Sequence, residues 1–223
     1  MRRALAVVAL ALLPSVSQAS VIAWTDWTAS DLASAKGTLA GIDVTFLGGL
    51  QFAQLDFGTM VGGGASAVTD YWTEGSPAPY TGNSVVDNRP PGYELLAFNQ
   101  ASTNRLTFSS PIENPIMAIV SMGQAGLPVT YDFDTPFTVL SEGQGFWGDG
   151  TYVLGAGDTL TGFELHAVIQ FQGSISQIQW TSTAENWHGF TVGAASPVPE
   201  PGTMGLLVAG VLGLAARVRG RRR

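Results

Sequence analysis

The chain has 223 residues, no cysteine and a formal net charge of −7. Seven of its ten basic residues lie in the first 3 and the last 7 positions, which leaves residues 20–195 with three basic and sixteen acidic side chains. This balance excludes a nucleic-acid partner, which would need clustered Lys and Arg, and the absence of cysteine excludes disulfides and thiol chemistry.

The N-terminal stretch has the pattern of an export signal. Arg2 and Arg3 precede ten apolar residues at 4–13, and a short polar stretch then ends in Ser17-Gln18-Ala19. A basic start, a short apolar run and a small-x-small site predict a secretory signal peptide over residues 1–19, cleaved between Ala19 and Ser20. An uncleaved anchor is the alternative, but ten apolar residues are too few to span a bilayer.

Residues 20–195 are predicted to form one all-β domain. Apolar and polar residues alternate in many short runs, for example at 42–46 and 163–171, with Gly- and Pro-rich turns between them. The more continuous apolar run at 115–122 predicts a strand covered on both faces. The sequence therefore predicts an antiparallel two-sheet sandwich of the jelly-roll kind, with a barrel as the alternative.

Two stretches depart from this strand pattern. Residues 28–40 are the one place where a short helix is expected, capped by Ser30. Residues 58–92 are rich in Gly, Pro, Ser, Thr and Asn but contain Tyr71, Trp72 and Tyr80, so we expect an ordered surface excursion of the kind that often carries binding.

Familiar catalytic signatures are missing from the sequence. Residues 143–148 match G-x-G-x-x-G, but a strand rather than a helix is expected after them, so a hairpin loop is predicted in place of a dinucleotide site. His166 falls on the polar phase of its strand and is expected to be solvated, and with His188 as the only other histidine the pattern does not indicate a zinc site. No cofactor is therefore predicted, calcium apart.

Calcium is the metal that the sequence could accommodate. The candidate ligands are aspartates on one predicted strand face or in Gly-rich turns, where carboxylates and backbone carbonyls supply the oxygens that calcium prefers. They are Asp132, Asp134, Asp149 and Asp158. The competing interpretation is that these side chains are solvated and cap their own turns.

Aromatic residues suggest a carbohydrate-binding surface. Of the six tryptophans, Trp180 fits the buried phase of its strand, whereas Trp72, Trp147 and Trp187 fall near turns and beside acidic residues. Rings beside polar groups can stack on sugar faces while hydroxyls are hydrogen-bonded, so these three are the candidate glycan contacts.

A glycoside hydrolase is the enzymatic alternative. It would require two carboxylates to face each other across a cleft. The candidates are Asp70, Glu74, Glu94, Asp149, Glu164 and Glu185.

The C-terminal stretch 196–223 has three consecutive parts. A motif at 198–203, which reads Val198, Pro199, Glu200, Pro201, Gly202 and Thr203, precedes an uncharged, mostly apolar segment at 204–216 and a basic tail at 217–223. Thirteen residues are fewer than a helix usually needs to span hydrocarbon, but the arginines that follow favour leaving that end in the cytoplasm, so a C-terminal transmembrane helix is predicted.

The order of these three parts resembles the PEP-CTERM sorting signal of exported Gram-negative proteins. The resemblance implies an exosortase-type membrane enzyme as partner, anchoring in the inner membrane before processing, and then a place at the cell surface or outside the cell. PEP-CTERM systems accompany exopolysaccharide production, so a non-catalytic structural or adhesive role is expected, with extracellular polysaccharide as the partner class. A carbohydrate- or calcium-dependent binding module is the main alternative, and a glycoside hydrolase the lesser one.

Overall fold

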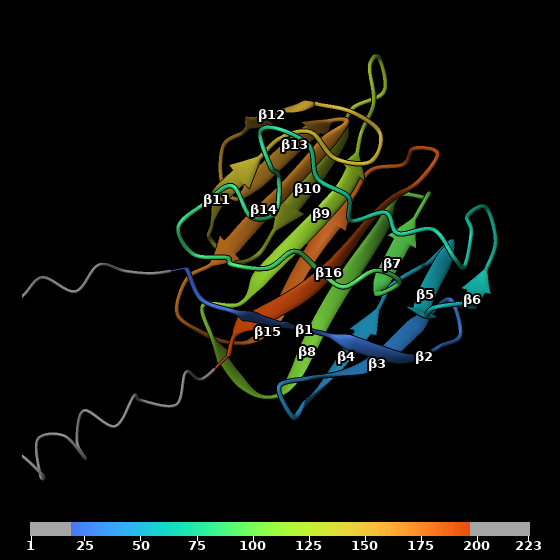
Figure 1. Ribbon diagram of the computed structural model, residues 1–223, viewed down its shortest axis with the longest axis vertical. Helices are drawn as coiled ribbons and strands as arrows, with labels where there is room; N and C mark the ends of the chain where they lie inside the picture. The colour runs from blue at the N-terminus through green and yellow to red at the C-terminus, as the bar shows by residue number, and fades with distance from the viewer. Residues whose placement is uncertain (1–18, 197–223) are drawn as a thin grey trace, which may run out of the picture.

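A computed structural model describes residues 19–196, which form two eight-stranded antiparallel sheets packed face to face (Figure 1). Sheet one contains β1 (Ile22–Trp24), β5 (Phe52–Asp56), β6 (Thr59–Gly62), β7 (Leu95–Phe98), β9 (Ile116–Met122), β11 (Phe137–Glu142), β14 (Leu165–Phe171) and β16 (His188–Ala195). Sheet two contains β2 (Asp26–Ser30), β3 (Ser34–Leu39), β4 (Ile42–Leu47), β8 (Ser102–Glu113), β10 (Val129–Phe133), β12 (Thr151–Leu154), β13 (Thr159–Phe163) and β15 (Ser174–Ser182).

The strand order is that of a jelly roll. Sheet one runs β11-β14-β9-β16-β7-β5-β6, with β1 added beside β16, and sheet two runs β12-β13-β10-β15-β8-β4-β3-β2. Along the chain, β7 to β10 and β13 to β16 switch sheets at every step, which produces the four-strand blocks β7-β16-β9-β14 and β8-β15-β10-β13 of two Greek keys. The predicted two-sheet sandwich is confirmed, and sheet edges remain open where a barrel would close them.

The helix expected over 28–40 is wrong. The stretch forms β2 and β3. Along β3, buried residues alternate with more exposed ones, and the buried ones are Ala35, Gly37 and Leu39. Between the strands, the carboxylate of Asp31 accepts hydrogen bonds from the backbone N–H groups of Ala33 and Ser34 and holds a tight turn. Alternation of buried and exposed residues beside a turn that a side chain caps is typical of a β-hairpin. This pattern explains why the stretch forms two strands and no helix.

The main core lies between the two sheets and is rich in aromatic rings. Phe46, Phe98, Trp180 and Phe190 contact one another with ring centroids 5.3–6.4 Å apart. Trp180 is 1% exposed, as its strand phase predicts. Strand β9 is buried at every position between β14 and β16, which confirms the predicted central strand.

A second core lies on the outer face of sheet one. Residues 63–94, here called the covering segment, cross that face as Figure 1 shows and bury Tyr71, Trp72 and Tyr80 against β9 and β14. The predicted excursion is thus ordered, and most of its rings point toward the sheet. An ion pair of 2.7 Å between Arg89 and Asp70 links two parts of the covering segment.

The two ends of the described chain lie side by side. Strand β1 pairs with the last residues of β16, in the register Ile22 to Ala195 and Trp24 to Gly193. Ser20, the predicted first residue after cleavage, forms a parallel bridge with Val86 of the covering segment. The cleavage itself stays a prediction, because residues 1–18 lie outside the described part of the chain. Across residues 19–196 the structure contains no helix of the length and apolarity needed to cross a membrane.

Candidate functional site

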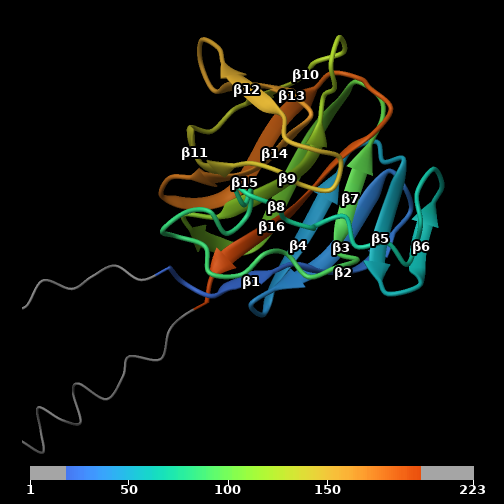
Figure 2. The same cartoon turned by 45° about the horizontal axis from the view of Figure 1, so that its top comes forward.

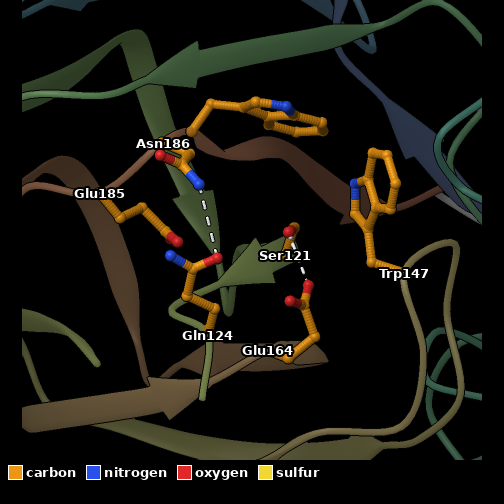
Figure 3. A pocket seen from close by; sticks show the side chains of 7 residues that line it. Ser121, Gln124, Trp147, Glu164, Glu185 and Asn186 are labelled. Atoms are coloured by element: carbon orange, nitrogen blue, oxygen red, sulfur yellow. Dashed lines mark hydrogen bonds between the residues drawn. The ribbon is translucent and has the colours of Figure 1, made fainter. Parts of the chain in front are cut away.

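A pocket of about 250 Å³ lies where β9 ends, β14 begins and the loop at 183–187 leads into β16 (Figure 3). Its position follows from the jelly-roll order, which places β9 between β14 and β16. Seven residues line it: Ser121, Gln124, Trp147, Glu164, Glu185, Asn186 and Trp187.

An irregular strand pair forms the floor of the pocket. The pairing of β14 with β9 shifts register between Leu165 and Ala167, and both Ser121 and Glu164 adopt a positive φ, of 54° and 65°. Non-glycine residues rarely adopt this conformation, and β-bulges often re-aim side chains at functional sites. Here the Ser121 hydroxyl donates a hydrogen bond of 2.7 Å to Oε1 of Glu164 (Figure 3).

Glu164 is a carboxylate in an unfavourable environment. Burial raises the pKa of Glu164, the negative charge of Glu185 adds to that rise, and the hydrogen bond from Ser121 opposes it. Its side chain is still 27% exposed and therefore accessible from the pocket. A partly buried carboxyl group with a perturbed pKa in a concave site is a candidate functional residue.

Glu185 is held more tightly. Its side chain is 2% exposed, and Oε1 accepts a hydrogen bond of 2.6 Å from the backbone N–H of Gly123. Nδ1 of His188 lies 3.1 Å from the same oxygen. Burial nevertheless lowers the pKa of His188, with the Glu185 carboxylate opposing that shift. Glu185 therefore contributes negative charge to the wall of the pocket while it also ties the loops together.

His166 is buried, and its predicted exposure to solvent is wrong. The ring is 0% exposed, with Nδ1 3.3 Å from the Tyr80 hydroxyl and Nε2 3.8 Å from Oε1 of Glu164. Burial lowers the pKa of His166 to about 4. The polar phase of β14 faces the covering segment, and Gly145 packs directly on the imidazole so that a Cβ there would overlap the ring. The 143–148 loop is closed by a bridge between Gly145 and Gly148, as a hairpin-like loop requires.

Two of the three predicted glycan contacts meet at the pocket. Trp147 is 53% exposed, and its ring centroid lies 6.4 Å from that of Trp187. Two further rings pack against this pair: Phe146 contacts Trp147, and Tyr71 contacts Trp187. The centroids of Phe146 and Tyr71 are themselves 5.0 Å apart. Rigid rings that are held by other rings keep their faces available to a ligand.

Trp72, the third predicted glycan contact, is buried and does not line the pocket. It is 0% exposed, packs edge-on against Tyr80 and donates its indole N–H to the backbone carbonyl of Glu94 at 3.2 Å. Its place in an irregular segment suggested exposure, but the covering segment uses this ring as its anchor on sheet one.

Comparison with known proteins identifies the end of the chain. Residues 197–223 match the family model described as the PEP-CTERM protein-sorting motif. The chain ends in a PEP-CTERM sorting motif. No curated protein and no solved structure shows significant similarity to the chain. The PEP-CTERM motif supports an exported protein that an exosortase sorts, while the predicted membrane helix at 204–216 lies outside the described residues.

The four aspartates proposed as calcium ligands do not gather at one place in the structure. Asp132 on β10 and Asp134 just after this strand do line one surface hollow, where Asp134 accepts a hydrogen bond from the backbone N–H of Gln179. Asp149 is exposed in the loop after Trp147, and Asp158 lies in a turn before β13. Within residues 19–196 no three Asp, Glu or His side chains lie close enough to share a metal ion.

Of the six carboxylates proposed for a hydrolase, only Glu164 and Glu185 line the pocket. Three of the other four are engaged elsewhere: Asp70 pairs with Arg89, Glu74 accepts hydrogen bonds from the backbone of Tyr80 and Thr81, and Glu94 accepts one from the backbone of Trp27. The fourth, Asp149, is exposed in the loop after Trp147.

Sequence reasoning missed the neutral polar residues of the pocket, Ser121, Gln124 and Asn186. A serine inside the otherwise apolar run at 116–122 was the available signal for the first of them.

Proposed function

We propose that this exported PEP-CTERM protein binds polysaccharide at the cell surface or in the extracellular matrix through the pocket between Trp147 and Trp187. The observation that supports the proposal is a half-exposed tryptophan held against a second one at the mouth of a pocket whose walls are polar. Aromatic faces stack on the apolar faces of sugar rings, while hydroxyl, amide and carboxylate groups orient the sugar by hydrogen bonds.

The dimensions of the pocket favour a small part of a polymer. Drug-sized ligands usually occupy roughly 300–1,000 Å³, and the pocket measures about 250 Å³. One sugar unit would fit with its ring against Trp147. Glu164 and the amides of Gln124 and Asn186 would accept and donate hydrogen bonds to its hydroxyls.

Replacing Trp147 by alanine is expected to weaken glycan binding about tenfold, the effect of losing one stacking contact of about 1.4 kcal/mol. The measurement is isothermal titration of the protein with oligosaccharides prepared from the host's exopolysaccharide. Phe57→Ala is the matched control, because Phe57 is 63% exposed but lies in the β5–β6 turn outside the pocket. Equal losses of affinity in the two variants would contradict a binding site at Trp147.

Sorting makes a separate prediction. In a host that contains an exosortase, we expect cleavage near residues 198–203, which lowers the intact mass of the protein. The protein should then move from the membrane to the envelope or medium, and neither change should occur in a host without the enzyme. A mass that still includes Arg223 in both hosts would mean that the motif is not processed.

A glycoside hydrolase is the second candidate, because Glu164 and Glu185 line the same pocket. Binding without hydrolysis is favoured, since a catalytic pair needs both carboxylates open to substrate and the Glu185 side chain is 2% exposed. Release of reducing ends from the bound polysaccharide, abolished by Glu164→Gln, would reverse this preference.

A further inference from the structure

We propose that the pocket selects a glycan unit that carries a free amine, so that its ligand is a positively charged amino sugar. This inference rests on the proposed glycan-binding function and specifies its ligand class. It starts from the composition of the pocket, whose seven lining residues include two carboxylates and no basic side chain.

No basic side chain of residues 19–196 neutralises these carboxylates. The three basic residues of that range are placed elsewhere: Arg89 pairs with Asp70, Lys36 lies on β3 beside a different surface hollow, and Arg105 lies on β8 opposite Gln179. The exposed Asp149, two residues after Trp147, adds charge of the same sign to the loop at the rim.

The two nearby histidines do not supply the missing positive charge either. His166 lies 3.8 Å from Glu164 and His188 lies 3.1 Å from Glu185, but both rings are 0% exposed. Burial lowers the pKa of both, that of His166 to about 4, so both are neutral near pH 7. Tyr80, behind His166, is also uncharged there because burial raises its pKa. The remaining groups around Glu164 are neutral: Ser121 on β9, Gln124, Asn186 and the tryptophans.

An ammonium group is the ligand that this arrangement favours. The charge of Glu185 repels that of Glu164, and a cation beside Glu164, the carboxylate that is exposed to the pocket, relieves that repulsion and the cost of burying Glu164. Trp147 and Trp187 add a face for the sugar ring and attract cations through their π systems. A uronic acid, which carries its own carboxylate, is disfavoured by the same charges.

The pH dependence of binding follows from linkage. Because an ammonium group favours the ionised form of Glu164, binding lowers the raised pKa of this carboxyl group and releases a proton. Affinity for the amino sugar should therefore rise with pH across the acid range, while affinity for a neutral glycan should change little.

The test is a titration of the full-length protein with three oligosaccharides of equal length: glucosamine oligomers, their fully N-acetylated counterparts and oligogalacturonate. We expect the glucosamine oligomers to bind at least tenfold more tightly than the N-acetylated ones, and the oligogalacturonate most weakly. Glu164→Gln should remove most of the advantage of the free amine, so that the free and the N-acetylated oligomers bind this variant with similar affinity. Glu113→Gln, the same change at an exposed position on β8, is the control.

The outcomes separate the two proposals. Equal affinity for the free and N-acetylated oligomers, with both weakened by Trp147→Ala, would overturn the amino-sugar inference and leave glycan binding intact. No binding of any glycan, including the host's exopolysaccharide, would overturn both. Displacement of the glucosamine oligomers by an equal concentration of spermidine would mean that charge alone is recognised, which also overturns the inference. The pH dependence in the wild-type protein tests it without relying on any variant.

Discussion

Replacing Trp72 by alanine is expected to lower the free energy of unfolding by about 3–5 kcal/mol, the usual range for removing a fully buried tryptophan. The ring is 0% exposed and belongs to the core between the covering segment and sheet one, and within the segment it packs on Tyr80 and donates a hydrogen bond to the carbonyl of Glu94. Its loss would create a cavity and leave that carbonyl without its partner, so the covering segment should loosen first.

Chemical denaturation measures the change in stability, and limited proteolysis within residues 63–94 detects the loosening. Trp147→Ala is the control with the same chemical change at a half-exposed ring, and it should alter stability by less than about 0.5 kcal/mol. If both variants lost similar stability, the covering segment would not depend on Trp72 as its anchor. Glycan binding should also fall in Trp72→Ala, because Tyr71 of the same segment supports Trp187 at 5.1 Å.

The stability of the protein is expected to fall as pH rises from 5 to 9, because of Glu94. This side chain is 9% exposed and accepts a hydrogen bond of 2.7 Å from the backbone N–H of Trp27. Burial raises the pKa of Glu94 to about 8, that hydrogen bond opposes the rise, and repulsion from Asp26 and Asp56 adds to it.

The sign follows from proton binding. In the unfolded chain Glu94 ionises at the ordinary glutamate pKa, so between that value and about 8 the folded state holds a proton that the unfolded state has lost. The contribution to stability is full below the ordinary pKa and is lost as pH rises through the folded value.

Glu94→Gln isolates this contribution. A neutral amide oxygen can still accept the hydrogen bond from Trp27, so the difference in unfolding free energy between variant and wild type should grow in favour of the variant as pH increases. Comparing the two proteins at each pH cancels the titration of His166, His188 and Glu164. Parallel pH profiles from 5 to 9 would rule out a raised pKa at Glu94.

Local alternation was sufficient to predict the sandwich and its strands other than β2 and β3, because a strand with one buried face shows its period whatever its partners are. The same reasoning was wrong where a residue's surroundings depend on distant segments. His166 occupies a polar strand phase and Trp72 an irregular segment, yet both are buried because the covering segment lies over the outer face of sheet one. No local pattern shows that a sheet face will be covered by a segment some seventy residues away in the chain.

Several residues of the candidate site could be predicted from the sequence, but the fact that they lie together could not. Trp147 and Trp187 were singled out as rings near turns, and Glu164 and Glu185 as candidate carboxylates. They meet because the jelly-roll order brings the end of β9 and the start of β14 beside the start of β16, while the 143–150 loop folds over them. Spacing along the chain carries no information about that meeting, and Trp72 and Trp147 looked alike until their positions in the fold were known.

Strand β16 joins the pocket to the tail, and this arrangement determines how the molecule would carry load. Trp187 immediately precedes the strand and Ala195 ends it, about 25 Å further along, next to β1 (Figure 2). A pull between a bound polymer and an anchored C-terminus would therefore run along the axis of one strand. That strand is hydrogen-bonded to β9 on one side and to β7 and β1 on the other. Force along the axis would shear these bonds together rather than peel them one by one, so a polymer bound at the pocket would load the sheet along its most resistant direction.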